Sequence, residues 1–175
     1  VDTTPPTVSS VAITSATNKQ NNFVNATDVV SVTATFRETF PSAVIVDNSS
    51  GNPTITLVVG STNQPAAFTS GSNTNASGSA SLVFKYTIQS GDTDTNGISI
   101  GADALALNNG TISDRAGNVA TNLTHDAVPN NSSYKVDTTP PSVTTFEMDD
   151  IEIKTDETAT VDLVFSEAIC AVSSE

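Results

Sequence analysis

The chain has 175 residues, with 19 Asp or Glu against 6 Lys or Arg, and its formal net charge is −13. A nucleic-acid partner is excluded, because neutralising phosphates requires Lys and Arg, and no apolar run approaches the roughly 20 residues that a membrane span needs. Cys170 is the one cysteine, so no disulfide can form within the chain. These features leave an acidic protein that enters neither a nucleic-acid complex nor a membrane.

Short runs of alternating apolar and polar residues, separated by turn-forming clusters, predict an all-β chain. The 27 Thr residues and the many Val and Ile residues suit half-buried strands better than helices. The expected strands are residues 7–14, 28–36, 43–47, 54–59, 66–69, 81–89, 98–100, 105–107 and 119–123. Seven or more short strands at this spacing indicate an antiparallel β-sandwich.

The sequence also repeats itself. Residues 1–8 return at residues 136–143 with seven of eight positions identical, and both copies contain Val-Asp-Thr-Thr-Pro-Pro. Residues 36–40 and 165–169 both begin Phe-x-Glu, at the end of an alternating run. Repetition at a fixed period is typical of a tandem array. We therefore expect one domain over residues 1–135 and the truncated start of a second such domain over residues 136–175.

The proline pair has a physical role in this organisation. Two successive prolines fix φ near −65° and bias the preceding residue towards extended geometry, so each joint is a semi-rigid spacer. Charge is uneven across the joint: residues 1–135 carry nine acids and five bases, whereas residues 136–175 carry ten acids and one base. This balance suits an extracellular protein that collects divalent cations, although solubility alone would favour the same composition.

One segment has the spacing of a calcium-binding loop. Asp92, Asp94 and Asn96 fall at positions one, three and five, with Gly97 at position six and Asp103 at position twelve. Calcium prefers alternating oxygen ligands from one tight loop. An Asx-rich turn between two strands would have the same residue types, and both interpretations stay open.

The alternation of strand direction in a sandwich predicts a second acidic group. Asp2 precedes the first strand, Glu38 ends the second predicted strand, and Asp114 opens a late turn that contains Gly117. All three should lie at the pole where the linker enters. The alternative is that Asp114 only caps a hairpin turn and that Asp2 only solubilises the linker.

The opposite pole should hold the other acids. Asp92, Asp94 and Asn96 follow a long strand, and we expect them near Asp137 and, across the junction, near Glu167. A cluster of carboxylates repels itself, and a divalent cation removes the repulsion. Because all the candidate ligands are oxygens, the expected ion is Ca²⁺ rather than Zn²⁺.

In combination, these motifs carry a resemblance to a known family. The Val-Asp-Thr-Thr-Pro-Pro joint, residues 165–169, residues 91–98 and residues 114–118 resemble the bacterial immunoglobulin-like repeats of giant secreted surface proteins, including RTX-type and biofilm-associated adhesins. The resemblance implies an immunoglobulin-like β-sandwich, an extracellular place on the bacterial cell surface, and neighbouring repeats of the same polypeptide as partners. It also implies calcium stiffening and no enzyme activity, with any cell-surface or glycan ligand bound by other domains.

Catalytic signals are weak. His125 is the only histidine and is expected to flank a strand, Cys170 is expected to be an apolar filler, and Lys85 faces away from its apolar neighbours. The leading expectation is a structural extender that holds a distal adhesive head away from the cell. The alternatives are a ligand-binding adhesin domain that uses loops such as residues 71–78, and an accessory domain of a secreted enzyme.

Overall fold

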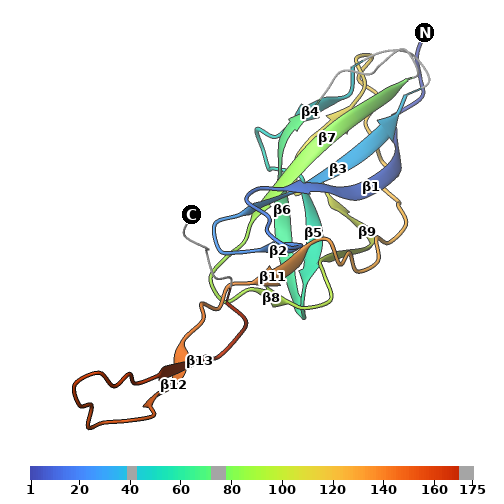
Figure 1. Cartoon of the computed structure of the whole chain (residues 1–175). Coiled ribbons are helices and arrows are strands. Elements are labelled where there is room, and N and C mark those ends of the chain that lie inside the picture. Colours follow the sequence, from blue (N-terminus) through green and yellow to red (C-terminus); the bar gives the residue numbers. More distant parts are fainter. Residues whose placement is uncertain (39–42, 72–77, 170–175) are drawn as a thin grey trace. The chain divides into compact units, whose positions relative to one another are not determined.

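The computed structural model describes residues 1–38, 43–71 and 78–169 (Figure 1). The chain divides into two compact units, Val1–Thr138 and Thr139–Glu175. All regular elements among the described residues are β-strands, and no described helix is long and apolar enough to cross a membrane. The predicted all-β fold is confirmed.

A six-stranded sheet forms the body of the first unit, in the order β1-β3-β7-β6-β5-β9, and every neighbouring pair in it is antiparallel. A small sheet pairs β4 with β10, and a three-stranded sheet places β11 between β2 and β8. The bounds are β1 (Thr7–Ala16), β2 (Phe23–Val24), β3 (Val29–Arg37), β4 (Ile45–Asp47), β5 (Thr54–Val59), β6 (Thr62–Gly71), β7 (Ser79–Thr87), β8 (Thr93–Asp94), β9 (Ser99–Ala106), β10 (Thr111–Ser113) and β11 (Lys135–Asp137).

The core is built from alternate residues of facing strands, as the period of two in the sequence predicts. In β3 and β7 every second side chain is buried, and large residues face small ones: Phe36 pairs with Ala80, and Leu82 pairs with Ala34. The same apolar cluster includes Ile55 of β5 and residues of β9. The two ends of the curled sheet therefore share one core, which makes the first unit a β-sandwich.

The structure differs from the sequence prediction in the short elements. The predicted strands at residues 98–100 and 105–107 are joined in the single strand β9, which begins at Ser99, ends at Ala106 and carries a register shift opposite β5. Residues 119–123 were predicted as a strand, but among them only Val119 makes a bridge, to Ser113. Strands β2, β8, β10 and β11 were missed, because elements of two or three residues are too short to show a period.

Figure 1 shows the two poles of the first unit. The N-terminus lies at one pole, and β2, β8 and β11 lie at the opposite pole. The unit ends at Thr138, three residues beyond the expected boundary at residue 135. The difference has a cause: Val136 is fully buried and belongs to β11, so the start of the repeated linker is part of the first unit.

The described residues of the second unit, up to residue 169, form one hairpin, made of β12 (Val143–Met148) and β13 (Val161–Phe165). Its register repeats the opening hairpin of the first unit: Val143 pairs with Phe165 as Val8 pairs with Phe36. Each pair connects the two repeated sequence segments, because Val143 is the counterpart of Val8 in the first repeat and Phe165 is the counterpart of Phe36 in the second. The repetition is therefore present in strand pairing as well as in sequence.

The two hairpins share an irregularity too. A register shift follows Val8 in the first hairpin and Val143 in the second. At the shifted position the Ser9 hydroxyl donates to the Thr35 carbonyl at 3.1 Å, and the Thr144 hydroxyl donates to the Val164 carbonyl at 3.0 Å. A bulge with the same side-chain hydrogen bond is a local feature that unrelated hairpins have no reason to share.

Candidate metal centre

Three carboxylates meet at the pole where the chain begins. Asp2 precedes the proline pair, Glu38 follows β3, and Asp114 follows β10, and one carboxylate oxygen of each lies within 4.8 Å of the others. Glu38 and Asp114 are buried and Asp2 is half-buried. We call Asp2, Glu38 and Asp114 the linker-pole cluster. Their convergence is the arrangement that strand direction predicted.

Asp114 is held by the turn that it opens. The backbone N–H and the side-chain amide of Asn118 donate to its two carboxylate oxygens at 2.8 and 2.7 Å. Gly117 has φ 91°, a conformation that side chains disfavour, so glycine suits this turn. Burial alone raises the pKa of the Asp114 carboxyl, but hydrogen bonds from Asn118 and the turn backbone outweigh it, and the pKa lies below its ordinary value. Asp114 is therefore charged at neutral pH.

The other two members are fixed by neighbouring backbone. The Thr4 N–H donates to Asp2 Oδ1 at 3.0 Å, and the Asn118 side chain donates to the Asp2 carbonyl at 3.2 Å. The Glu38 N–H donates to the Gly78 carbonyl at 2.7 Å. A Cβ on Gly78 would lie 2.2 Å from the Glu38 carbonyl oxygen, so only glycine permits this approach. Asn118 thus connects the linker to the turn that carries Asp114.

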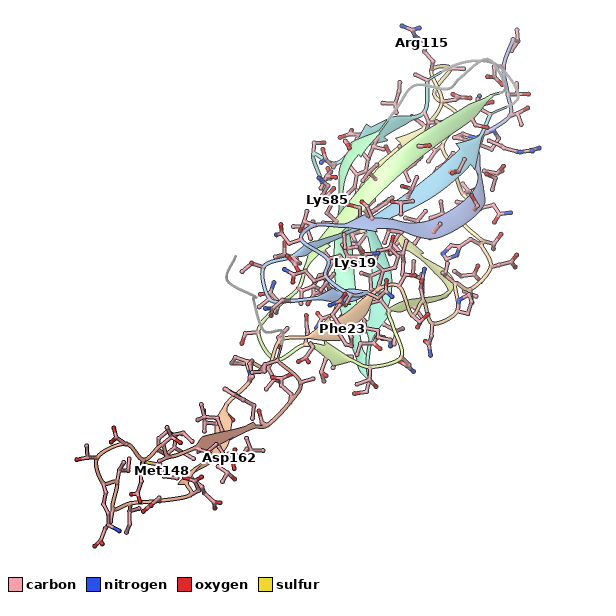
Figure 2. The ribbon with its side chains drawn as sticks, viewed as in Figure 1. Lys19, Phe23, Lys85, Arg115, Met148 and Asp162 are labelled. Atoms are coloured by element: carbon pink, nitrogen blue, oxygen red, sulfur yellow. The ribbon has the colours of Figure 1, made fainter. Side chains whose placement is uncertain are left out.

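The chemistry of the cluster favours a hard cation. Three carboxylates this close repel one another, and their oxygens are the ligands that Ca²⁺ prefers. Two arginines adjoin the cluster in sequence: Arg37 is exposed, and Arg115 projects away from the body at this pole (Figure 2). The donor set contains neither His nor Cys, which Zn²⁺ and softer metals would require. The residues present therefore fit calcium, with the remaining ligands supplied by backbone carbonyls or water.

The opposite pole has a different arrangement. Residues 92–103 are not one continuous loop, because Thr93–Asp94 is strand β8 and Asp103 lies within strand β9. Within the described part of the chain, the linker-pole cluster is the only group of three or more His, Cys, Asp or Glu side chains close enough to share an ion. The EF-hand-like spacing was wrong as a guide to a single loop, because the same residue types also build Asx turns.

Asp94 is buried and serves the backbone. Its Oδ1 accepts from the N–H groups of Asn96 at 3.2 Å and Gly97 at 2.7 Å, and its Oδ2 accepts from Gly60 N–H at 2.8 Å. These bonds close the turn after β8 and tie it to the β5–β6 turn. Asn96 contributes its backbone N–H to Asp94, as in the Asx-rich turn that the sequence left open as the alternative to a calcium loop.

Asp92 is buried and makes three contacts of the same kind. Its Oδ2 accepts from the Tyr86 hydroxyl at 2.6 Å and from Gln89 N–H at 2.9 Å, and its Oδ1 accepts from the Gln64 side chain at 3.2 Å. Burial raises the pKa of the Tyr86 phenol well above its ordinary value, and the hydrogen bond and charge of Asp92 raise it further. Polar groups of the fold therefore satisfy this carboxylate.

Asp103 and Ala104 of the edge strand β9 make hydrogen bonds to His125, away from both poles' acidic groups. Asp103 has φ 55°, and its carboxylate accepts from His125 N–H at 3.0 Å, while the imidazole Nε2 accepts from Ala104 N–H at 2.9 Å. His125 Nδ1 lies 2.8 Å from the Asp126 carbonyl and donates to it. The histidine therefore flanks a strand, as predicted, and fixes the loop that covers the sheet edge.

The two remaining candidates lie on either side of the linker. Asp137 ends β11 and pairs with Thr93 of β8, so its backbone is at the pole where it was predicted, next to Asp92 and Asp94. Glu167 follows β13 in the second unit and is half-buried. Its approach to Asp137 stays a prediction. Cys170 and most of the 71–78 loop lie outside the described residues.

No protein-family model matches the chain, and neither the curated proteins nor the solved structures compared with it contain a match. The function must therefore be argued from the repeat and the linker-pole cluster. Sequence reasoning missed Asn118, whose place in Asp-Arg-Ala-Gly-Asn was interpreted only as a turn. The role of Asn118 could have been predicted from its position four residues after Asp114, because a turn of this length brings its two ends together.

Proposed function

We propose that this chain is a structural extender from a long bacterial cell-surface adhesin, built from tandem immunoglobulin-like domains and stiffened by calcium at its joints. The observation that carries the proposal is the position of Asp2. It belongs to the repeated linker, yet its carboxylate lies with Glu38 and Asp114 of the domain that follows. A cation bound there would fix the linker to the domain.

The repeated hairpin supports the tandem arrangement. β12 and β13 repeat the register and the bulge of β1 and β3, which supports the proposal that the second unit is the start of another copy of the same fold. Its described residues bury no side chain, and Phe146 is 65 % exposed. A hairpin of this kind requires further strands to form a core. The proposed neighbours are therefore repeats of the same polypeptide, placed outside the cell.

A metal-dependent melting temperature tests the calcium site. Extracellular modules bind Ca²⁺ with dissociation constants of about 10⁻⁴–10⁻³ M, and a ligand at ten times its dissociation constant stabilises by about 1.4 kcal/mol. For a unit of this size we expect calorimetry to show a melting temperature roughly 3–5 °C higher in calcium than in EDTA.

Two variants of the 175-residue chain sharpen the measurement. Glu38→Gln should abolish most of the calcium response, because it removes a charge from the cluster. Asp126→Asn should retain the response, because it removes one exposed charge elsewhere. Identical melting curves in calcium and EDTA would refute the metal site. Binding of glycans by the isolated chain on an array would instead favour the ligand-binding alternative.

A further inference from the structure

The repeated linker occurs twice, and its two occurrences have different surroundings. Val136 is fully buried in β11, whereas Val1, its counterpart, is fully exposed. Val136 pairs in parallel with Val24 of β2 and in antiparallel fashion with Asp94 of β8. The same valine of the linker is therefore a core residue at its second occurrence and solvent-exposed at its first.

The threonine of the linker shows the same contrast. The Thr138 hydroxyl accepts from Gly91 N–H at 3.0 Å and donates to the Asp92 carbonyl at 3.0 Å, which fastens the linker to the turn after β7. Thr3, its counterpart, is exposed. The contacts of residues 136–138 are thus those of a closing strand, and residues 1–3 have the same sequence without a sheet to close.

We infer that residues 1–3 are the closing strand of a preceding copy of this domain, in which they lie between strands equivalent to β2 and β8. The inference rests on the proposed function, because it requires that copies of the domain follow one another. The partner of this segment is therefore a second copy of this domain, and the contact is strand pairing plus burial of one valine.

The aspartate of the linker, Asp2 or Asp137, then contacts two domains. The backbone of Asp137 pairs with Thr93 of the domain before it. The carboxylate of Asp2 lies with Glu38 and Asp114 of the domain after it. Since the two aspartates are equivalent, one residue at each joint has its backbone in one domain and its side chain in the next. Adjacent domains consequently overlap in sequence, without a flexible spacer between them.

A two-copy chain tests the inference, with residues 1–135 followed directly by residues 1–175. Three valine-to-serine variants are compared: at the first Val1, at the Val1 of the joint, and at Val136 of the downstream copy. The joint variant should lower the melting temperature of the upstream copy by about 3 °C or more, as expected for a polar group in a core. The Val136 variant should do the same to the downstream copy, and the first Val1 variant should change neither.

Limited proteolysis followed by mass measurement identifies which copy opens first, because the downstream copy carries the additional 40 residues. Valine-to-alanine variants at the same three sites give a graded version if serine prevents folding. A joint variant that behaves like the first Val1 variant overturns the inference. All melts are repeated in EDTA: strand sharing is independent of metal, so a missing calcium response would refute the metal site and leave this result intact.

Discussion

The first unit has acidic groups at both poles, and they differ in what surrounds the carboxylates. At the far pole, Asp92 and Asp94 each accept three hydrogen bonds from the fold. At the linker pole Asp114 also accepts two hydrogen bonds, from Asn118, but there one carboxylate oxygen from each of three separate segments lies within 4.8 Å of the others. The far pole carries the sequence motif of a calcium loop, whereas the linker pole has no contiguous motif. The spacing of residues along the chain therefore did not predict which carboxylates lie together in space.

The comparison predicts its largest effect at Asp94. Asp94→Ala leaves three backbone N–H groups, of Gly60, Asn96 and the buried Gly97, without their acceptor, which should cost about 3 kcal/mol of unfolding free energy. Urea unfolding in EDTA measures it. Asp94→Asn keeps one oxygen acceptor and should lose less. If Asp94→Ala lowers the unfolding free energy only in calcium and leaves it unchanged in EDTA, the carboxylate is a metal ligand and the structural interpretation is wrong.

A second prediction concerns Tyr86, which donates to Asp92. Tyr86→Phe removes one buried hydrogen bond and should cost about 1–2 kcal/mol. The folded-state pKa of the phenol is raised, so its stabilisation is fully present below the ordinary value of 10.0 and is lost as the pH rises towards the folded-state value. Tyrosinate absorbance during an alkaline titration should show Tyr86 ionising only together with unfolding. Its ionisation in the folded protein near pH 10 would contradict the buried pair.

The sequence predicted those parts of the fold in which alternation is long enough to have a period. β3 and β7 were located to within two residues, since nine consecutive residues alternate in each. The three-stranded sheet of β2, β8 and β11 was not predicted, because two or three residues carry no periodic signal and their partners are distant in sequence. β11 was assigned to the linker for the same reason, which is why the predicted boundary fell before Val136.

The candidate site was predicted unevenly. The alternation of strand direction placed Glu38 and Asp114 at the pole of Asp2, because the direction of a strand is unaffected by errors in its predicted ends. The Asp92-to-Asp103 spacing did not predict how these side chains are used, because spacing cannot show whether a carboxylate accepts hydrogen bonds from the fold. That distinction depends on Gly60 and Gln64, which come from a different hairpin.

The third prediction uses the lowered pKa of Asp114. A carboxyl whose pKa is depressed on folding contributes stability above the unfolded value of about 3.9, and the contribution is lost as the pH falls through the folded-state pKa. The difference in stability between the natural chain and Asp114→Asn should therefore shrink below about pH 4. Acid unfolding followed by circular dichroism measures this, with Asp126→Asn as the control. A difference that is constant from pH 7 to pH 2 would contradict the assignment.

The smallest effect is expected at Asp2, and its sign distinguishes the two poles. Asp2→Asn retains an oxygen that can accept from Thr4 N–H while it removes one of three mutually repelling charges. In EDTA the variant should be as stable as the natural chain or more stable by a few tenths of a kcal/mol, because half-buried like charges then repel less. In calcium the order should reverse, since the ion loses a charged ligand. Melting curves in both buffers give the comparison, and Asp126→Asn should show no such reversal. A loss of stability in EDTA similar to that of Asp94→Ala would mean that the linker pole, like the far pole, uses its carboxylates only for internal hydrogen bonds.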